Sequence, residues 1–131
     1  MPYDLNVPFW SDNAIKSRWF SVPNTNLTLG FNATGNWSFP TGTVWIKHFE
    51  LELTNGLAAS RQRLETRFIV RNPNGIYGIT YRWDSATNAT LVPEVGTNDT
   101  LVINDGGTVR TQVWHYPARS ECLVCHVAAG G

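Results

Sequence analysis

Two cysteines and a histidine near the end of the chain have the spacing that most clearly indicates chemistry. Cys122 and Cys125 are three residues apart, and His126 follows directly. This Cys-x-x-Cys-His spacing is the attachment pattern of a c-type haem. The two thiols can bond two vinyl groups on one porphyrin edge while the adjacent imidazole reaches the iron. We therefore predict one covalent haem c, with Cys122 and Cys125 as the thioether residues and His126 as the proximal iron ligand.

Chance does not readily produce this motif. The chain has only two cysteines and three histidines among 131 residues, so about three in ten thousand random arrangements would place them in this pattern. Three other interpretations stay open. A redox dithiol is expected at the start of a helix within a βαβ unit, and the residues before Cys122 do not predict such a unit. A zinc site would need His115 or His48 as a fourth ligand, and adjacent Cys and His chelate one ion awkwardly. The third is a structural cysteine pair beside an ordinary histidine.

Length and composition predict a single globular domain, because 131 residues with 42% hydrophobic content can bury a core of their own. Ten basic and ten acidic residues cancel, so bulk charge does not indicate binding to nucleic acid or to an anionic membrane. The sequence has no apolar run of about 18 residues, and we expect no membrane span.

Short segments of alternating polarity predict an all-β fold. Turn-forming Gly, Pro, Asn and Asp separate the strand candidates, which lie at residues 28–31, 36–39, 43–53, 62–71, 76–84, 89–95, 100–103 and 108–116. This spacing indicates an antiparallel β-sandwich or small barrel of about seven or eight strands with a C-terminal haem-attachment segment. Within one domain spanning 1–131, residues 1–25 are expected to be an irregular lead-in with a helical turn near 13–16, and residues 117–131 a haem-binding tail.

Alternation also predicts which side chains face inward. In segment 62–71, Leu64 and Phe68 are expected to face the core, and Glu65 and Arg67 the solvent. Gly78 in the next strand could let a large flat ligand approach the backbone, although a bulge is the commoner meaning of a strand glycine. The candidates for an apolar wall around the haem are Trp45, Trp83, Trp114 and Tyr116.

The second iron ligand has few candidates. The only methionine is Met1, so the His/Met ligation of familiar small cytochromes is not expected. The candidates are His48, His115, a terminal amine or an open site. His115 lies eleven residues before His126, and the short segment between them would have to wrap around the porphyrin edge. His48 comes from a separate strand without that restriction. We favour His48 as the distal ligand, with His115 as the alternative, and hence a low-spin, bis-histidine haem.

Several motifs together resemble one bacterial protein family. They are Tyr3-Asp4-Leu5-Asn6, Phe9-Trp10-Ser11-Asp12, Phe39-Pro40-Thr41-Gly42-Thr43-Val44, Lys47-His48-Phe49-Glu50-Leu51, Leu64-Glu65-Thr66-Arg67 and Trp114-His115-Tyr116-Pro117-Ala118-Arg119-Ser120-Glu121-Cys122. Over nearly the whole chain they resemble an uncharacterised family of CxxCH-containing β domains. That family is found in large secreted proteins beside PQQ-dependent sugar dehydrogenase-like propellers and cytochrome c domains. The sequence departs from it at Ala118, where serine is expected, and at Asn13, where glycine is expected. The resemblance implies electron transfer by association and supplies no catalytic residues.

These observations predict a monohaem c-type cytochrome domain, not an enzyme, that carries electrons from a dehydrogenase to a later acceptor. The expected partner is a redox protein such as a PQQ-type sugar dehydrogenase or another cytochrome. Covalent haem attachment belongs to oxidising compartments, so we expect a periplasmic or extracellular location. The first residues do not form a secretory signal, so we expect either that a signal was removed or that the sequence is a domain of a longer chain, and we favour the second.

Two other classes of function compete with this prediction. One is a carbohydrate-binding or adhesion β-sandwich in which exposed Trp and Tyr stack on a ligand and the Cys-x-x-Cys pair is structural. The other is a haem enzyme with an open distal site. The presence of covalent haem would distinguish a cytochrome from the carbohydrate-binding sandwich. Binding of carbon monoxide to the reduced protein would distinguish the haem enzyme from a cytochrome with two axial ligands.

Overall fold

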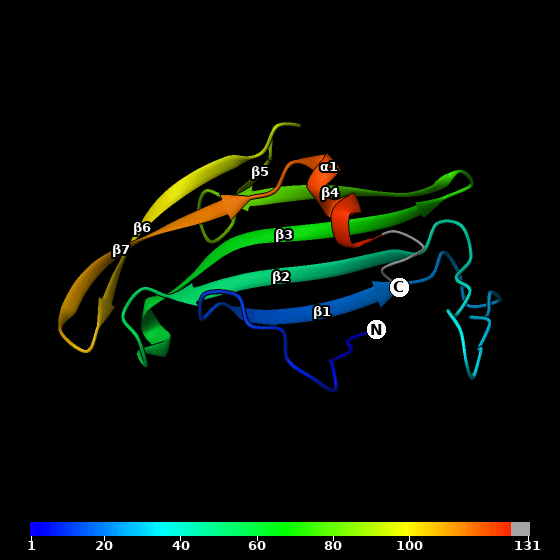
Figure 1. Cartoon of the computed structure of the whole chain (residues 1–131), viewed down its shortest axis with the longest axis horizontal. Helices are drawn as coiled ribbons and strands as arrows, with labels where there is room; N and C mark the ends of the chain where they lie inside the picture. Colours follow the sequence, from blue (N-terminus) through cyan, green and yellow to red (C-terminus); the bar gives the residue numbers. More distant parts are fainter. Residues whose placement is uncertain (127–131) are drawn as a thin grey trace.

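The structure, a computed structural model, describes residues 1–126. Its seven strands form two antiparallel sheets, so the predicted all-β sandwich is confirmed (Figure 1). The larger sheet has the order β1-β2-β3-β4-β5, and β6 pairs with β7 in the second. The strands are β1 (Ile15–Ser21), β2 (Val44–Glu52), β3 (Arg61–Asn72), β4 (Gly75–Trp83), β5 (Ala89–Leu91), β6 (Thr97–Asp105) and β7 (Thr108–Tyr116), and the helices are η1 (Ala58–Ser60) and α1 (Arg119–Cys125).

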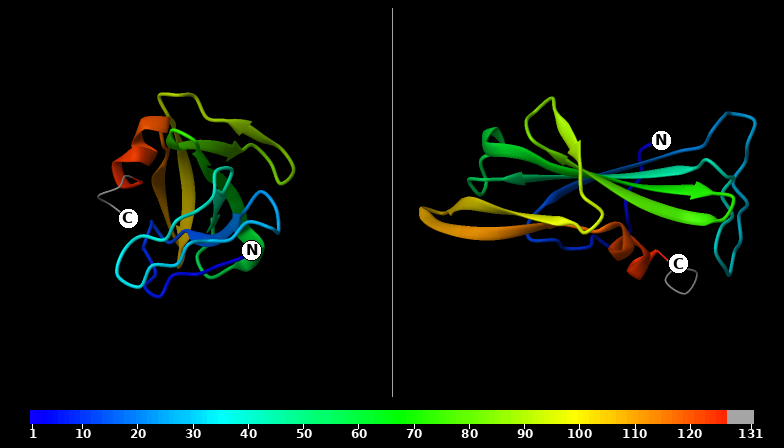
Figure 2. Two further views of the ribbon diagram at one scale, coloured as in Figure 1. Left: turned by 90° about the vertical axis from the view of Figure 1, so that its right-hand side faces the viewer. Right: turned by 90° about the horizontal axis from the view of Figure 1, so that it is seen from above.

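The β6–β7 hairpin and α1 lie on the same side of the five-stranded sheet (Figure 2). Phe49 of β2 meets Trp114 of β7 edge to face, with ring centroids 5.7 Å apart. Cys122 of α1 lies against Gly78 of β4. We call this side of the sheet the covered face and the opposite side the open face.

The strand register assigns each side chain to one of these faces, because directly paired residues in antiparallel strands point to the same side. The covered face carries Phe20, Trp45, Ile69 and Gly78 in one row, Arg18, Lys47, Arg67 and Thr80 in the next, and Lys16, Phe49, Glu65 and Arg82 in a third. The open face carries Trp19, Ile46, Phe68 and Ile79 in one row and Ser17, His48, Thr66 and Tyr81 in the next.

A bulge in β3 makes the predicted inward and outward faces wrong from Glu65 onward, whereas the inward position of Leu64 is confirmed. Arg63 and Glu65 pair with consecutive residues of β2, which leaves Leu64 without a partner. One extra residue shifts the alternation of all later side chains to the other face. Leu64 and Glu65 therefore both enter the core, at 1% and 0% exposure. Arg67 lies on the covered face, and Phe68 lies on the open one.

The core lies between the two sheets, near the end of the five-stranded sheet that the hairpin covers. It consists of Phe49, Leu51, Leu64, Val92, Leu101, Ile103, Trp114 and Tyr116. The carboxylate of Glu65 is buried beside this cluster, where Arg67 donates two hydrogen bonds to it at 2.9 and 2.5 Å and the Trp114 indole donates a third at 3.2 Å. Burial raises the pKa of Glu65, and the hydrogen bonds and the charge of Arg67 act in the opposite direction.

Other local predictions had mixed outcomes. Residues 15–21 form edge strand β1, so the expected irregular lead-in and helical turn are wrong there, because pairing with β2 orders a segment that has weak local preferences. Segments 28–31 and 36–39 form only one bridge, between Gly30 and Ser38. Strands β2, β4, β6 and β7 are confirmed, and so is the edge position of β5.

Within residues 1–126 no helix is long and apolar enough to cross a membrane.

Candidate haem-attachment site

Helix α1 presents the Cys-x-x-Cys-His motif. It begins after Pro117, and the Glu121 carboxylate accepts a hydrogen bond from the Ala118 backbone N–H at 2.6 Å at the helix start. Residues three apart on a helix lie on the same side, so Cys122 and Cys125 share one side of α1. Both thiols are free. This is the arrangement that two thioether bonds to one porphyrin edge require.

The two thiols differ in environment. Cys122 is buried, and a Cβ built on Gly78 would lie 2.5 Å from both its Cβ and its Sγ. Only a glycine at position 78 lets α1 approach the sheet this closely. Burial raises the pKa of the Cys122 thiol. Cys125 is exposed. The sheet-facing sulfur is therefore fixed by packing, whereas the second thiol is accessible from outside.

His126 ends α1 and lines an apolar hollow of about 680 Å³. This volume falls within the roughly 300–1,000 Å³ of typical ligand and cofactor sites. The aromatic and aliphatic side chains around the hollow are Trp37, Phe39, Trp45, Ile69 and Ile76. Phe39 and Trp45 meet edge to face with centroids 4.7 Å apart. Trp45 is thus the predicted wall residue that does line the space beside the motif.

The imidazole of His126 lies near cationic side chains of the covered face. Burial lowers its pKa, and the charges of Lys47 and Arg67 lower it further. The neutral form is the one that ligates metal. The residues that could hold a covalent haem are therefore the two free thiols of α1 and the imidazole that follows them. Of these three residues, only His126 lines the hollow.

His48 lies on the open face. Its Nδ1 is 2.8 Å from the hydroxyl of Thr66, and its ring meets Trp83 edge to face at 5.9 Å. Burial lowers its pKa, with Glu50 opposing. The sheet separates His48 from α1 and His126, so the structure does not bring together the residues that the sequence favoured as the two axial ligands. The predicted wall residue Trp83 lies on the same open face.

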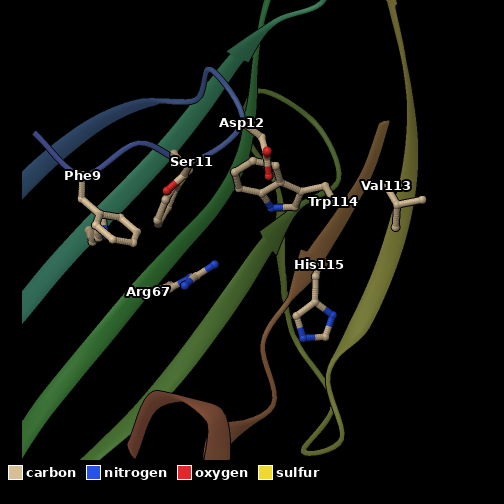
Figure 3. A pocket seen from close by; sticks show the side chains of 9 residues that line it. Phe9, Ser11, Asp12, Arg67, Val113, Trp114 and His115 are labelled. Carbon is tan, nitrogen blue, oxygen red and sulfur yellow. The ribbon is translucent and has the colours of Figure 1, made fainter. Parts of the chain in front are cut away.

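His115 lies on the covered side but is held at the surface. Its Nδ1 is 2.7 Å from the side-chain oxygen of Asn98, and its Nε2 is 2.9 Å from the Glu121 carboxylate. It lines a second, smaller hollow of about 220 Å³. Figure 3 shows this hollow, with Arg67 on the sheet, Phe9 and Ser11 from the lead-in, and His115 from β7. His115 is the alternative histidine, and it shares the covered side with the motif.

The other two predicted wall residues belong to the core. Trp114 and Tyr116 are 5% and 1% exposed. The Tyr116 hydroxyl donates to Asp99 at 2.9 Å, and burial together with that carboxylate raises the pKa of the phenol.

The sequence did not predict a row of three cations on the covered face. Arg18, Lys47 and Arg67 lie directly opposite one another on β1, β2 and β3. The alternation of polar and apolar residues did not predict this row, because the bulge changes the face on which Arg67 lies. In addition, β1, which carries Arg18, was not predicted as a strand.

Within residues 1–126, no three His, Cys, Asp or Glu side chains cluster closely enough to hold a metal ion. The four-ligand zinc arrangement considered from the sequence is therefore not formed in this part of the chain. None of the family models, curated proteins or solved structures with which the chain was compared matches it.

Proposed function

We propose that this chain is a monohaem c-type cytochrome domain that transfers single electrons outside the cytoplasm. The observation that carries the proposal is the position of the motif. Cys122, Cys125 and His126 lie at the C-terminal part of one helix, and His126 lines an apolar hollow large enough for a cofactor. Bound haem would supply one-electron chemistry at its iron, and histidine ligation without methionine corresponds to a lower potential than His/Met ligation.

Different residues of the chain would hold different parts of the haem. Cys122 and Cys125 would form the thioether bonds, and His126 would ligate the iron. Trp45, Ile69 and the other apolar side chains of the hollow would exclude water from the porphyrin face. Low solvent exposure is one of the factors that sets the potential of a protein-bound haem. No residue is assigned to bond making or breaking in a substrate.

The partners of the proposed domain are a donor dehydrogenase, such as a PQQ-type sugar dehydrogenase, and a later acceptor such as another cytochrome. This assignment rests on the family resemblance and on the expected extracytoplasmic location. Electron-transfer contacts are small and transient, so a redox partner needs no large apolar patch on this surface.

Expression with a cytochrome c maturation system tests the proposal. We expect a pyridine haemochrome typical of two thioether bonds, and haem that stays with the polypeptide through denaturing electrophoresis. Cys122→Ala or Cys125→Ala should give the single-thioether spectrum, and the double variant should lose covalent haem. Thr80→Val on the same sheet face is the control and should load normally. Wild-type protein without covalent haem would refute the proposal.

The open face supports a second candidate, a carbohydrate-binding sandwich. Trp19 and Tyr77 on this face are 37% and 44% exposed, and Tyr81 lies on the same strand and face as Tyr77. Exposed aromatic rings on a sheet can stack on sugar rings. If this candidate is correct, Tyr77→Ala should reduce retention on polysaccharide gels in affinity electrophoresis, and the cysteine variants should have no effect.

A further inference from the structure

The smaller hollow, which His115 also lines, combines aromatic walls with two adjacent cations. Its volume is about 220 Å³, and the rings of Phe9, Phe49 and Trp114 line it together with Lys47 and Arg67. The Lys47 ammonium and the Arg67 guanidinium lie over the Phe49 ring, 4.9 and 4.7 Å from its centroid. The two cations come from directly paired positions of β2 and β3, so they lie side by side in the hollow.

Lys47 lacks a counter-ion. Within residues 1–126 it has no carboxylate within ion-pair distance, and its side chain is half-buried. The residues opposite it are Arg18 and Arg67, and like charges directly opposite one another on a sheet are destabilising. Burial and these two charges lower the pKa of Lys47 to about 8, so the amine is still mostly protonated at pH 7. An anion in the hollow would relieve this unfavourable arrangement.

The Phe49 ring does not replace a counter-ion. It attracts the ammonium through its π face, but an ammonium has three N–H donors, and the ring has no oxygen or nitrogen that could accept them. A carboxylate oxygen can accept such a bond and also supplies the missing charge.

Arg67 can donate to a ligand without releasing Glu65. The Glu65 carboxylate accepts hydrogen bonds from Nε and Nη2 of Arg67, which uses two of the five N–H donors of an arginine. Figure 3 shows the guanidinium between Phe9 and His115, beside the hollow. Because Glu65 already balances the charge of Arg67, this side chain serves as a hydrogen-bond donor, and Lys47 supplies the charge.

We propose that the smaller hollow binds a small organic carboxylate with an aromatic or otherwise apolar body. Lys47 pairs with the carboxylate, Arg67 donates a second hydrogen bond, and Phe9 and Trp114 contact the body of the ligand. An engineered cavity of about 150 Å³ holds benzene, so about 220 Å³ is enough for one ring with one carboxylate. This site lies apart from the residues proposed to hold haem and does not rest on the proposed function.

Asp12 restricts the charge of the ligand. Its exposed carboxylate lines the same hollow and repels an anion, about twice as strongly for a doubly charged phosphate as for a monocarboxylate. Inorganic phosphate also has no apolar part for the rings to contact. The imidazole of His115 is already engaged by Asn98 and Glu121. These features favour a monocarboxylate over phosphate.

Isothermal titration calorimetry of the full chain at pH 7 tests the site with benzoate, and with benzamide as an uncharged ligand of the same shape. Benzoate should bind at least about tenfold more tightly, because a hydrogen bond between charged groups contributes about this factor. Lys47→Gln should remove the difference, and Lys47→Arg should keep it. Asp12→Asn should strengthen benzoate binding. Arg71→Gln, which removes an exposed arginine of the larger hollow, is the matched control and should leave binding unchanged.

Several outcomes would overturn the proposal. Equal affinity for benzoate and benzamide, or no binding of benzoate, would show that the hollow does not recognise a carboxylate. Tighter binding of inorganic phosphate than of benzoate would contradict the ligand class, and loss of benzoate binding in Arg71→Gln would place the ligand in the larger hollow. If Lys47→Gln does not fold, the comparison of benzoate with benzamide in the wild type and in Asp12→Asn decides. Haem attachment enters none of these measurements, so this proposal and the proposed function can fail separately.

Discussion

At the scale of single residues, Gly78 has the clearest structural role. Its missing side chain lets the buried thiol of Cys122 reach the surface of β4. A glycine in a strand can allow a close approach to the backbone, as was expected here for a ligand. The group that approaches in the structure is α1 itself, which thereby places the motif beside the hollow.

Gly78→Ala should displace α1 and reduce haem attachment. The added Cβ would lie 2.5 Å from Cys122, and overpacking of this kind typically costs about 1–3 kcal/mol. Urea unfolding and the haem content per polypeptide would measure the two effects. Thr80→Val, two residues further on the same face, is the control, because the buried Thr80 hydroxyl has no hydrogen-bond partner among residues 1–126. Normal loading of Gly78→Ala would show that close helix packing is not required.

His48 gives a second prediction at this scale. A haem held by Cys122, Cys125 and His126 would lie across the sheet from His48, so His48→Ala should leave the visible spectrum of the reduced, haem-loaded protein unchanged. Loss of the contact with Thr66 should lower the unfolding free energy by about 1 kcal/mol. A change from low spin to high spin in this variant would restore His48 as an axial ligand and would contradict the assigned face.

At the scale of elements, the bulge in β3 decides the chemistry of the covered face. It places Glu65 in the core and Arg67 beside the motif. Without the extra residue at Leu64, both charges would lie on the open face with His48. The bulge thus creates the buried ion pair between Glu65 and Arg67 and places Arg67 opposite Lys47 on the covered face.

Glu65 should make stability depend on pH. Burial raises its pKa above the ordinary 4.5, so the folded protein retains a proton that the unfolded chain releases. This contribution to stability is fully present below about pH 4.5 and is lost as the pH rises through the raised pKa. Urea unfolding between about pH 4 and 7 should show this slope in the wild type and its absence in Glu65→Gln.

Glu65→Gln should also have a lower unfolding free energy than the wild type at neutral pH. A glutamine cannot accept both hydrogen bonds from Arg67, and a lost bond to a charged group costs about 1.5–3 kcal/mol. The matched control is Glu52→Gln, which removes the more exposed ion pair between Glu52 and Arg61. Its cost should be at most about 1 kcal/mol. If the unfolding free energy of Glu65→Gln falls with pH as steeply as that of the wild type, then a group other than Glu65 causes the pH dependence.

At the scale of the whole molecule, a polar network connects the two sheets. The Asp99 carboxylate of β6 accepts hydrogen bonds from the Tyr116 hydroxyl of β7 at 2.9 Å and from Arg82 of β4 at 2.8 Å. A bridge between Thr54 and Asn104 joins the sheets at another point. These contacts fix the hairpin on the covered face, and the chain continues from β7 directly into α1.

Tyr116→Phe should lower the unfolding free energy by about 1.5–3 kcal/mol, because the Asp99 carboxylate loses a hydrogen bond. Chemical denaturation of the haem-loaded protein would measure the loss. Val113→Ala on the exposed side of β7 should change stability by less than about 0.5 kcal/mol. If the network only stabilises the hairpin, the visible spectrum of folded Tyr116→Phe should equal that of the wild type.

Much of the architecture followed from the sequence alone. Alternating strands with turn residues between them predicted the antiparallel β fold, because the period of two and the turn chemistry of Asn72 to Gly75 are local properties. The attachment residues Cys122, Cys125 and His126 were predicted from spacing alone, and attachment itself stays a prediction. In β7 the burial follows the expected period of two, because Trp114 and Tyr116 are buried and His115 between them is exposed.

Only the tertiary structure decided which face of the sheet meets the motif. A one-residue bulge moves Glu65 and Arg67 from the expected solvent side to the covered face, and no local pattern marks it. Strand β1 forms because β2 pairs with it, and this pairing brings Arg18 to Lys47. The choice between His48 and His115 depended on the same fact, because no local pattern predicts on which face of the sheet α1 packs.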